Sequence, residues 1–320
     1  MQTMDVVIPV FNEEDCLSEL FERLCALREK LKARVELRVL FVNDGSSDQS
    51  PAMLHAMATK HEFVSVLSFT RNFGQQIAIS AGIDHVDADY AVIIDADLQD
   101  PPEVIEGMFD LIQAGNEMVY GQRRSRPGES ALKKLMASLF YWFLSALCDT
   151  EIPHSTGDFR IVSRRVVGEL KKMDESHRFL RGMIPWLGFK KSAYLYDRDE
   201  RYAGETKYTF PKMLRFAVDA IFSFSRKPLT YATYIGIVAT TIAGIGGLYL
   251  LYLKLFTDQA VPGITAVILT IILMGGLQVF IVGVIGQYIA RIFEETKNRP
   301  LYVIDQLTES RKRPSERRNT

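Results

Sequence analysis

The sequence predicts an α/β protein in which helices cover a mostly parallel sheet, followed by a C-terminal hairpin of two transmembrane helices. Three observations carry this prediction. Short β-rich runs alternate with helical patterns over residues 5–120. Two long stretches near the C-terminus contain no charged residue. Polar clusters follow the predicted strands, at the positions where open α/β sheets bind their ligands.

The predicted strands are short β-rich runs, and the predicted helices repeat apolar residues at three- and four-residue spacing. Five strands are expected, at Asp5–Val10, Glu36–Val42, Val64–Phe69, Tyr90–Ile94 and Glu117–Tyr120. Four helices are expected between them, near Glu13–Leu31, Ser50–Lys60, Gln75–His85 and Pro102–Gln113. This alternation is typical of parallel strands joined by crossover helices.

The two charge-free stretches predict the transmembrane hairpin. Each is longer than the roughly 20 apolar residues that a helix needs to cross a bilayer. We place the two helices at about residues 230–253 and 262–288, within a membrane segment at 229–291. Pro262 and Gly263 favour a turn between them. A pair of buried core helices is the alternative, and the length of the uncharged runs argues against it.

Basic residues flank the outer ends of this hairpin. Arg226 and Lys227 precede the first span, Arg291 and further cations follow the second, and the connecting loop offers only Lys254. By the positive-inside rule we expect the N-terminal domain and both termini in the cytoplasm, as in a multi-pass protein of the inner (cytoplasmic) membrane. The net charge of −1 gives no support for a nucleic-acid partner.

Four of the predicted strands are followed by polar clusters. These are Pro9-Val-Phe-Asn-Glu13, Asn43-Asp-Gly-Ser-Ser-Asp48, Thr70-Arg-Asn-Phe-Gly74 and Asp95-Ala-Asp-Leu-Gln-Asp100. One such cluster alone is explained equally well by turn and helix-cap chemistry. Four clusters at one edge of the same sheet indicate a shared ligand site.

The most informative of these clusters holds Asp95 and Asp97, which are separated by one small residue. Both carboxylates can leave the strand end toward one site, and Gln99 can add a carbonyl oxygen. Mg²⁺ or Mn²⁺ takes few carboxylates and fills its remaining positions with phosphate oxygens and water. The spacing therefore predicts a divalent-metal site for a phosphorylated ligand, with a simple turn-and-cap role as the alternative.

Five motifs occur in a fixed order along the chain. They are Val7-Ile-Pro-Val-Phe-Asn-Glu13, Asn43-Asp-Gly-Ser-Ser-Asp48, Asp95-Ala-Asp-Leu-Gln-Asp-Pro-Pro102, Gly157-Asp-Phe-Arg160 and Arg201-Tyr-Ala-Gly-Glu-Thr-Lys207. In this order the sequence resembles the family-2 glycosyltransferases of GT-A fold. Within them it is similar to the polyprenyl-phosphate glycosyltransferases related to bactoprenol glucosyltransferase and dolichol-phosphate mannose synthase. The resemblance runs from Val6 to about Pro300.

The resemblance implies a cytoplasmic GT-A domain at 1–207, a Rossmann-like fold that binds a nucleotide-sugar. It implies nucleotide-binding roles for Pro9, Glu13, Asp44 and Asp95. It implies metal ligands at Asp97 and Gln99, with Asp95 beside them. It implies that Arg201 and Lys207 close over the diphosphate, where a solvated surface pair is the alternative.

The two residues that the resemblance makes catalytic are Asp97 and Asp158. Asp158 is expected on the sugar side, where it orients the substrate or acts as a base. The alternative is a buried carboxylate paired with Arg160 that braces the fold. A lipid phosphate is already anionic near neutral pH, so the reaction needs positioning more than proton removal.

The acceptor phosphate is expected at the membrane surface. The resemblance implies contacts from Arg123, Lys134 and Ser138, with Lys134 where family members often carry Arg. An interfacial helix at about residues 130–147 joins cations to aromatic residues and suits the headgroup layer, and an ordinary amphipathic core helix is the alternative. A second amphipathic helix is expected at 208–228, and a basic cytoplasmic tail at 292–320.

The resemblance implies an inverting transfer of sugar from a nucleotide-sugar to polyprenyl (undecaprenyl) phosphate, with Mg²⁺ or Mn²⁺ as cofactor. A UDP-sugar of the glucose or N-acetylglucosamine type is expected, and the lipid-linked product would serve cell-envelope glycan modification. GDP-mannose and UDP-formamidoarabinose are the alternative donors. A non-catalytic membrane scaffold or nucleotide-sugar sensor is the alternative of another class. The family also implies a homo-oligomer, a tetramer by resemblance.

Overall fold

The computed structural model describes residues 1–124, 156–175, 178–197, 227–256 and 263–309. These residues divide into two compact units. The first unit comprises the described residues up to 197 together with 299–309, and the second comprises 227–256 and 263–298. The predicted helix at 130–147, and all but the last two residues of that at 208–228, lie outside the described part of the chain.

The first unit is built on one mixed sheet. Among the described residues, eight strands pair in the order β7-β5-β6-β4-β1-β2-β3-β8. All run parallel except β6 and β8, which are antiparallel to their neighbours. The strands are β1 Gln2–Val10, β2 Val35–Asn43, β3 Val64–Phe69, β4 Tyr90–Ile93, β5 Met118–Arg123, β6 Thr156–Ser163, β7 Lys191–Tyr196 and β8 Ile304–Thr308.

Helices cover both faces of this sheet. They are α1 Glu14–Leu31, α2 Ser50–Lys60, α3 Gln75–His85, α4 Val104–Gln113, α6 Arg164–Leu170 and α7 Leu180–Trp186. The α/β fold class predicted from the alternation is confirmed, and each of the five predicted strands and four predicted helices has a counterpart within a few residues.

The core forms because the central strands are apolar on both faces. Alternate residues of β1, including Met4, Val6 and Ile8, join one buried cluster with the leucines of α1 and the apolar residues of α4. Val7 points to the opposite face, where α3 lies against β1 and β2. A Cβ added at Gly82 of α3 would lie 2.2 Å from Cγ1 of Val7, so α3 packs at a distance that only glycine permits.

A buried ion pair joins the two central strands. Asp5 of β1 lies opposite Arg38 of β2 in the ladder, and Arg38 Nε donates to Asp5 Oδ1 at 2.7 Å. The side chains are 1% and 7% exposed. Asp5 also accepts the backbone N–H of Asp87 at 3.3 Å, whereas Arg38 Nη2 has no hydrogen-bond partner among the described residues. Removing either charge would leave the other buried without compensation.

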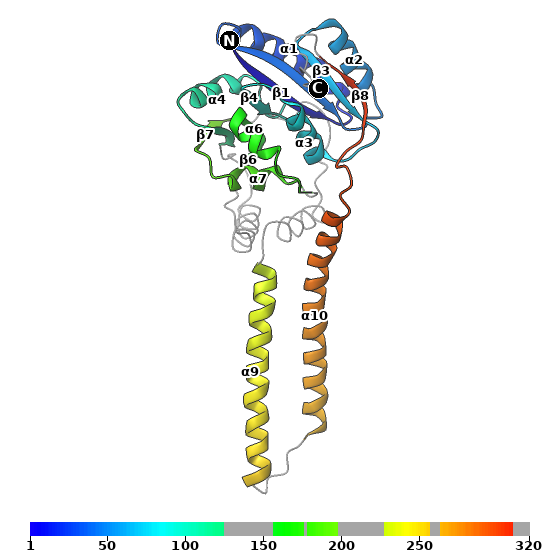
Figure 1. Cartoon of the computed structure of the whole chain (residues 1–320), viewed down its shortest axis with the longest axis vertical. Coiled ribbons are helices and arrows are strands. Elements are labelled where there is room, and N and C mark those ends of the chain that lie inside the picture. The colour runs from blue at the N-terminus through cyan, green and yellow to red at the C-terminus, as the bar shows by residue number, and fades with distance from the viewer. Residues whose placement is uncertain (125–155, 176–177, 198–226, 257–262, 310–320) are drawn as a thin grey trace, which may run out of the picture. The chain divides into compact units, whose positions relative to one another are not determined.

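The last described strand comes from beyond the membrane segment. Residues 304–308, which lie within the basic tail expected at 292–320, form β8 and pair with β3 as the last strand of the sheet (red in Figure 1). Just before β8, the Tyr302 ring stacks on Phe69 at 5.1 Å and its hydroxyl donates to Asp84 of α3 at 3.4 Å. Thr70 N–H also donates to the carbonyl of Val303 at 3.1 Å.

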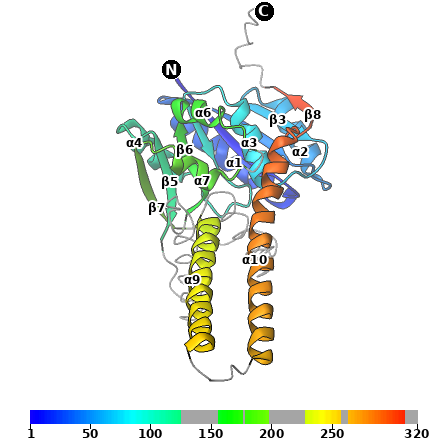
Figure 2. The ribbon, with the colours of Figure 1, turned by 60° about the horizontal axis from the view of Figure 1, so that its bottom comes forward.

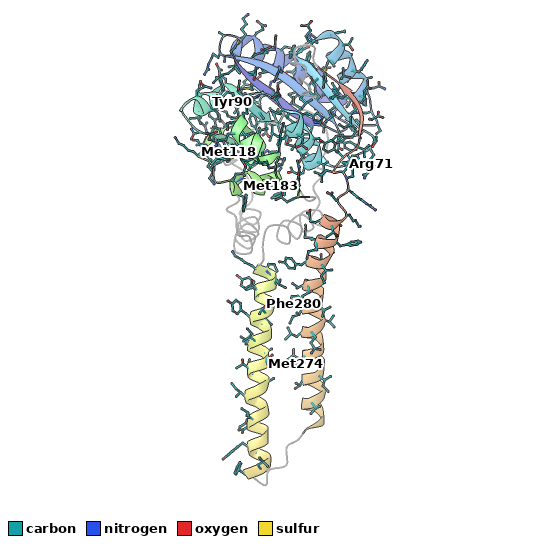
Figure 3. The ribbon with its side chains drawn as sticks, viewed as in Figure 1. Arg71, Tyr90, Met118, Met183, Met274 and Phe280 are labelled. Carbon is teal, nitrogen blue, oxygen red and sulfur yellow. The ribbon has the colours of Figure 1, made fainter. Side chains whose placement is uncertain are left out.

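The second unit holds two long apolar helices, α9 Lys227–Phe256 and α10 Ile264–Thr296 (Figure 2). Within the described residues, Lys227–Tyr249 and Leu273–Thr296 are long and apolar enough to cross a membrane. Only 6% and 0% of the residues in these two apolar segments are buried. They therefore do not have the burial expected of core helices. Side chains along α10, such as Phe280, stand out into the surroundings (Figure 3). Such exposure of apolar surface suggests membrane association.

Candidate active site

The predicted site residues meet where the parallel strands have their carboxyl ends. This side of the sheet is called its carboxyl edge below. β1, β2, β3 and β4 all end there, each followed by one of the polar clusters. Because β6 runs antiparallel between β4 and β5, it begins at this same edge. Ile93 pairs with Arg160, so Asp95 and Asp158, two residues further on in each direction, approach each other. The sequence analysis did not predict β6 as a strand.

The Asp95–Asp97 segment forms a tight turn directly after β4. The backbone N–H of Gln99 donates to Asp97 Oδ1 at 3.1 Å, and Leu98 between them has a φ of 60°. A left-handed conformation is uncommon for leucine and persists mostly where the surrounding structure holds the backbone in place. The turn therefore fixes the Asp97 carboxylate close to the Gln99 backbone.

Asp95 lies at the centre of an acidic group. Burial and, after it, the nearby charges of Asp158, Asp100 and Asp97 together raise its pKa to about 7, against the lowering effect of Arg181. Gln75 of α3 donates from Nε2 to Asp95 Oδ1 at 2.7 Å, but an amide adds no charge. Four carboxylates thus lie close together at this place, and a bound divalent cation would favour their charged forms.

These donor atoms fit a hard cation whose remaining ligands come from a phosphorylated substrate and water. Within the described ranges, no three His, Cys, Asp or Glu side chains come close enough to form a metal site on their own. Asp95 and Asp97 offer carboxylates, and Gln99 offers a carbonyl. Mg²⁺ commonly takes only one or two protein carboxylates and completes its shell with phosphate oxygens and water. A divalent metal is therefore plausible here.

Asp158 is 2% exposed and is held by a bidentate ion pair. Arg181 of α7 donates from Nε to Oδ1 and from Nη2 to Oδ2, both at 2.8 Å. Gln76 adds a third donor, from Nε2 to Oδ2 at 3.0 Å. Burial alone would raise the pKa of Asp158, but these partners hold it below its usual range. A buried carboxylate held ionised by three donors is a weak base.

Arg160, the partner that the sequence suggested for Asp158, is mainly engaged with the backbone. Its Nη2 lies 3.9 Å from Asp158 Oδ1, whereas its stronger contacts go to the carbonyls of Gly157 at 3.0 Å and Asp158 at 3.2 Å. Burial lowers the pKa of Arg160 to about 10. The principal partner of Asp158 is Arg181, which no motif identified in the sequence.

Asp44 holds the loop that leads into α3. Its carboxylate accepts the backbone N–H groups of Phe73 at 2.6 Å and Gly74 at 2.9 Å, and the Asn72 amide at 2.9 Å. Burial raises the pKa of Asp44, although the two backbone hydrogen bonds act in the opposite direction. Asp44 thus shapes the wall of the site, and its predicted contact with a nucleoside stays a prediction.

Gly45 lets this loop lie against the β2 end. It has a φ of 67°, and an added Cβ would lie 2.4 Å from the backbone carbonyl carbon of Arg71. We expect Gly45→Ala to displace Arg71 and Asn72 and to lower the free energy of unfolding by about 1–3 kcal/mol. We also expect it to weaken binding of the predicted nucleotide-sugar donor. The thermal midpoint of the full chain in detergent and the KM for the donor would measure this.

The matched control for this substitution is Gly115→Ala. Gly115 has a φ of 89° and nothing within 4 Å of an added Cβ, so the variant carries backbone strain without a steric clash. Equal losses of stability and donor binding in the two variants would contradict a packing role for Gly45.

The remaining predicted nucleotide residues lie at the end of β1. Pro9 is buried in the strand, opposite Val42 of β2. Glu13 immediately precedes α1, and its N–H donates to Ser50 Oγ at 3.1 Å. Asn12 links the β1 and β2 loops, since its side chain accepts the Ser47 N–H at 2.8 Å. The residues proposed to contact the nucleoside therefore share one edge with the acidic cluster.

Arg123, predicted to bind the acceptor phosphate, lies at the end of β5 and contacts a buried acid. Its Nη2 donates to the Asp100 carboxylate at 3.3 Å, and its Nε to the Tyr196 hydroxyl at 3.4 Å. Tyr196 in turn donates to Asp100. Lys134 and Ser138, and the diphosphate clamp Arg201 and Lys207, lie outside the described residues. Their assignments stay predictions.

The mixed sheet with an acidic group at the carboxyl ends of its parallel strands is an α/β architecture of the GT-A class. The profile described as Glycosyl transferase family 2 matches residues 5–171, and the chain belongs to that family.

Two relatives align over almost the whole chain. The glycosyltransferase YkcC of Bacillus subtilis (strain 168) is 46% identical over 93% of this chain and 92% of its own length. The prophage bactoprenol glucosyl transferase homolog of Escherichia coli (strain K12) is 39% identical over 94% and 98%. Among solved structures, glucosyl-3-phosphoglycerate synthase from Mycobacterium tuberculosis, in complex with Mn²⁺, UDP-glucose and phosphoglyceric acid, is 17% identical. It has a TM-score of 0.43, covering 69% of this chain and 78% of that one.

Proposed function

We propose that this glycosyltransferase moves a sugar from a UDP-sugar, of the glucose or N-acetylglucosamine type, onto a polyprenyl phosphate. The observation that carries the proposal is the presence of two elements in one chain: the Asp95–Asp97 site at the carboxyl edge, and two apolar helices of membrane-spanning length. The first suits a nucleotide-sugar and the second a lipid acceptor.

The lipid acceptor is supported further by the relatives. A protein named as a bactoprenol glucosyl transferase homolog is similar over 94% of this chain, a share that reaches into the part that holds α9 and α10. The proposal that glucose is the transferred sugar rests on the name of the same relative. The basic residues that flank the outer ends of the helices favour a catalytic domain on the cytoplasmic side of the membrane.

The proposed chemistry needs no strong base. A phosphate oxygen of the acceptor attacks the anomeric carbon, the bond from that carbon to the donor diphosphate breaks, and its electron pair leaves with the nucleoside diphosphate. Attack from the opposite side inverts the configuration. An anionic phosphate carries no proton that must be removed, which agrees with the poor basicity of the ion-paired Asp158.

The protein's part is to position the reactants and to stabilise charge. Asp97 and Gln99 would hold the divalent cation, which, when bound, offsets the negative charge that grows on the departing diphosphate. Asp95 contributes negative charge beside them, and Gln75 fixes its orientation. Asp158 is assigned to the sugar side, where its position is set by Arg181.

The test is a transfer assay on membranes that contain the full chain. Radiolabelled UDP-glucose, UDP-N-acetylglucosamine, GDP-mannose and UDP-formamidoarabinose would each be incubated with undecaprenyl phosphate and Mg²⁺ or Mn²⁺. We expect a labelled lipid from a UDP-sugar, absent when the undecaprenyl phosphate is omitted or when the membranes lack the chain. No labelled lipid from any of the donors would contradict the proposal.

A further inference from the structure

We propose that Gln76 is a positioning residue of the transfer reaction, which fixes the place of Asp158 relative to Asp95 through the first turn of α3. This inference rests on the proposed function and adds to it a residue that none of the sequence motifs includes. Gln76 touches neither of the predicted metal ligands, and it acts through the residues around it.

Both ends of the Gln76 amide are used. Nε2 donates to Asp158 Oδ2 at 3.0 Å, and Oε1 accepts the backbone N–H of Leu180 at 3.2 Å. Leu180 begins α7 and immediately precedes Arg181, which forms the bidentate pair with the same Asp158. One side chain of α3 thus holds both partners of that ion pair, one on β6 and the other on α7. An amide can do this because it offers a donor and an acceptor at once.

The neighbouring residue reaches the other side of the acidic cluster. Gln75 donates to Asp95 Oδ1 at 2.7 Å, so two successive residues at the start of α3 contact Asp95 and Asp158. The helix start is itself fixed, because Asp44 accepts the N–H groups of Phe73 and Gly74 just before it. A rigid helical turn that contacts both carboxylates sets the distance between them.

This separation matters for the proposed reaction because the sugar must lie between the diphosphate side and the acceptor side of the site. Asp95 and Asp97 mark the diphosphate side, and Asp158 is assigned to the sugar that lies between the two sides. A shift of Asp158 by about 1 Å would misplace the sugar and cost about 10²-fold in rate, without removing the groups that bind the nucleotide. The expected signature is a loss in kcat with little change in the KM for the donor.

The experiment compares Gln76→Glu with the wild-type chain, full length in detergent, using the UDP-sugar and undecaprenyl phosphate. Glutamate keeps the shape but cannot donate to Asp158, and it places a second carboxylate against the first. We expect kcat to fall about 10²-fold while the KM for the donor stays close to that of the wild type. An unchanged kcat would overturn the inference.

The matched control is Gln113→Glu. Gln113 is also an amide with two polar partners, Gln2 and the Tyr90 hydroxyl, each at 3.1 Å, but it lies at the amino ends of β1 and β4. This variant should keep the wild-type kcat. A loss equal to that of Gln76→Glu would overturn the inference, because it would show that the effect does not depend on the place of the amide.

A second variant separates positioning from folding. Gln76→Ala removes the hydrogen bond to Asp158 without placing a carboxylate against it. Its thermal midpoint should therefore lie closer to that of the wild type than the thermal midpoint of Gln76→Glu, while kcat stays low in both variants and the KM for the donor changes little. A wild-type kcat in Gln76→Ala would show that the loss in Gln76→Glu comes from the added charge and would overturn the inference. UDP release from the donor without lipid is measured in parallel. This reaction tests Gln76 even where no lipid product forms, so failure of the proposed acceptor is distinguished from failure of the inference.

Discussion

Replacing Asp97 by Asn is expected to lower sugar transfer by about 10³-fold or more while the protein stays folded and membrane-inserted. The substitution keeps the size of the side chain and an oxygen that can accept the Gln99 N–H, so the turn can persist. It removes one of the carboxylate charges on which a divalent cation depends. Transfer rates and Mn²⁺ binding followed by electron paramagnetic resonance would both report the change.

The control for this prediction is Asp110→Asn. Asp110 pairs with Arg34 at the surface of the first unit, and its side chain is 60% exposed. Such pairs contribute about 0–1 kcal/mol, so transfer and Mn²⁺ binding should match the wild type. Full activity of Asp97→Asn, or wild-type transfer in the presence of EDTA, would contradict the metal-binding role of Asp97.

The largest effect on stability is expected at Asp5. Asp5→Ala leaves the Arg38 guanidinium buried in the sheet without its counter-charge, and its Nη2 already lacks a hydrogen-bond partner among the described residues. Breaking a buried ion pair from one side typically costs about 3–5 kcal/mol. The thermal midpoint of the full-length protein in detergent should fall well below that of the surface variant Asp110→Ala.

A double variant tests the cause. Replacing both partners, as Asp5→Leu with Arg38→Met, removes the unpaired charge and should recover most of the lost stability, since apolar pairs of similar volume often substitute well for buried ions. Two outcomes would show that the cost of burying an unpaired charge does not explain the effect. One is that Asp5→Ala is no less stable than Asp110→Ala, and the other is that the double variant is as unstable as Asp5→Ala.

The central part of the fold could be predicted because its information is local. The apolar runs of β1 to β4 and the three- and four-residue spacing in α1 to α4 are visible in single segments of the chain. The acidic edge was predictable for a related reason: parallel strands place their carboxyl ends together, so polar residues after each strand must meet. Asp95 and Asp97 follow directly from that rule.

The rest depends on contacts between distant segments. β6 carries Asp158 and Arg160 inside its length, which interrupts the apolar pattern of a buried strand, and its antiparallel place between β4 and β5 is a property of the whole sheet. The hydrogen bond from Gln76 to Asp158 joins residues 82 positions apart. Arg181 belongs to no local pattern at all. Periodicity cannot reveal such partners, because each half of the contact is an ordinary polar residue on its own.

The return of the chain to β8 limits how it can be threaded through a bilayer. β7 lies before the two apolar helices and β8 after them, yet both are strands of one sheet. If α9 and α10 span a membrane as proposed, the number of crossings between β7 and β8 must be even, because both strands lie on the same side, and the two helices would supply two. This parity follows from the hydrogen bonds between β3 and β8, independently of any count of flanking charges. A chain lacking one span would deliver β8 to the opposite side of the membrane, where it could not complete the sheet.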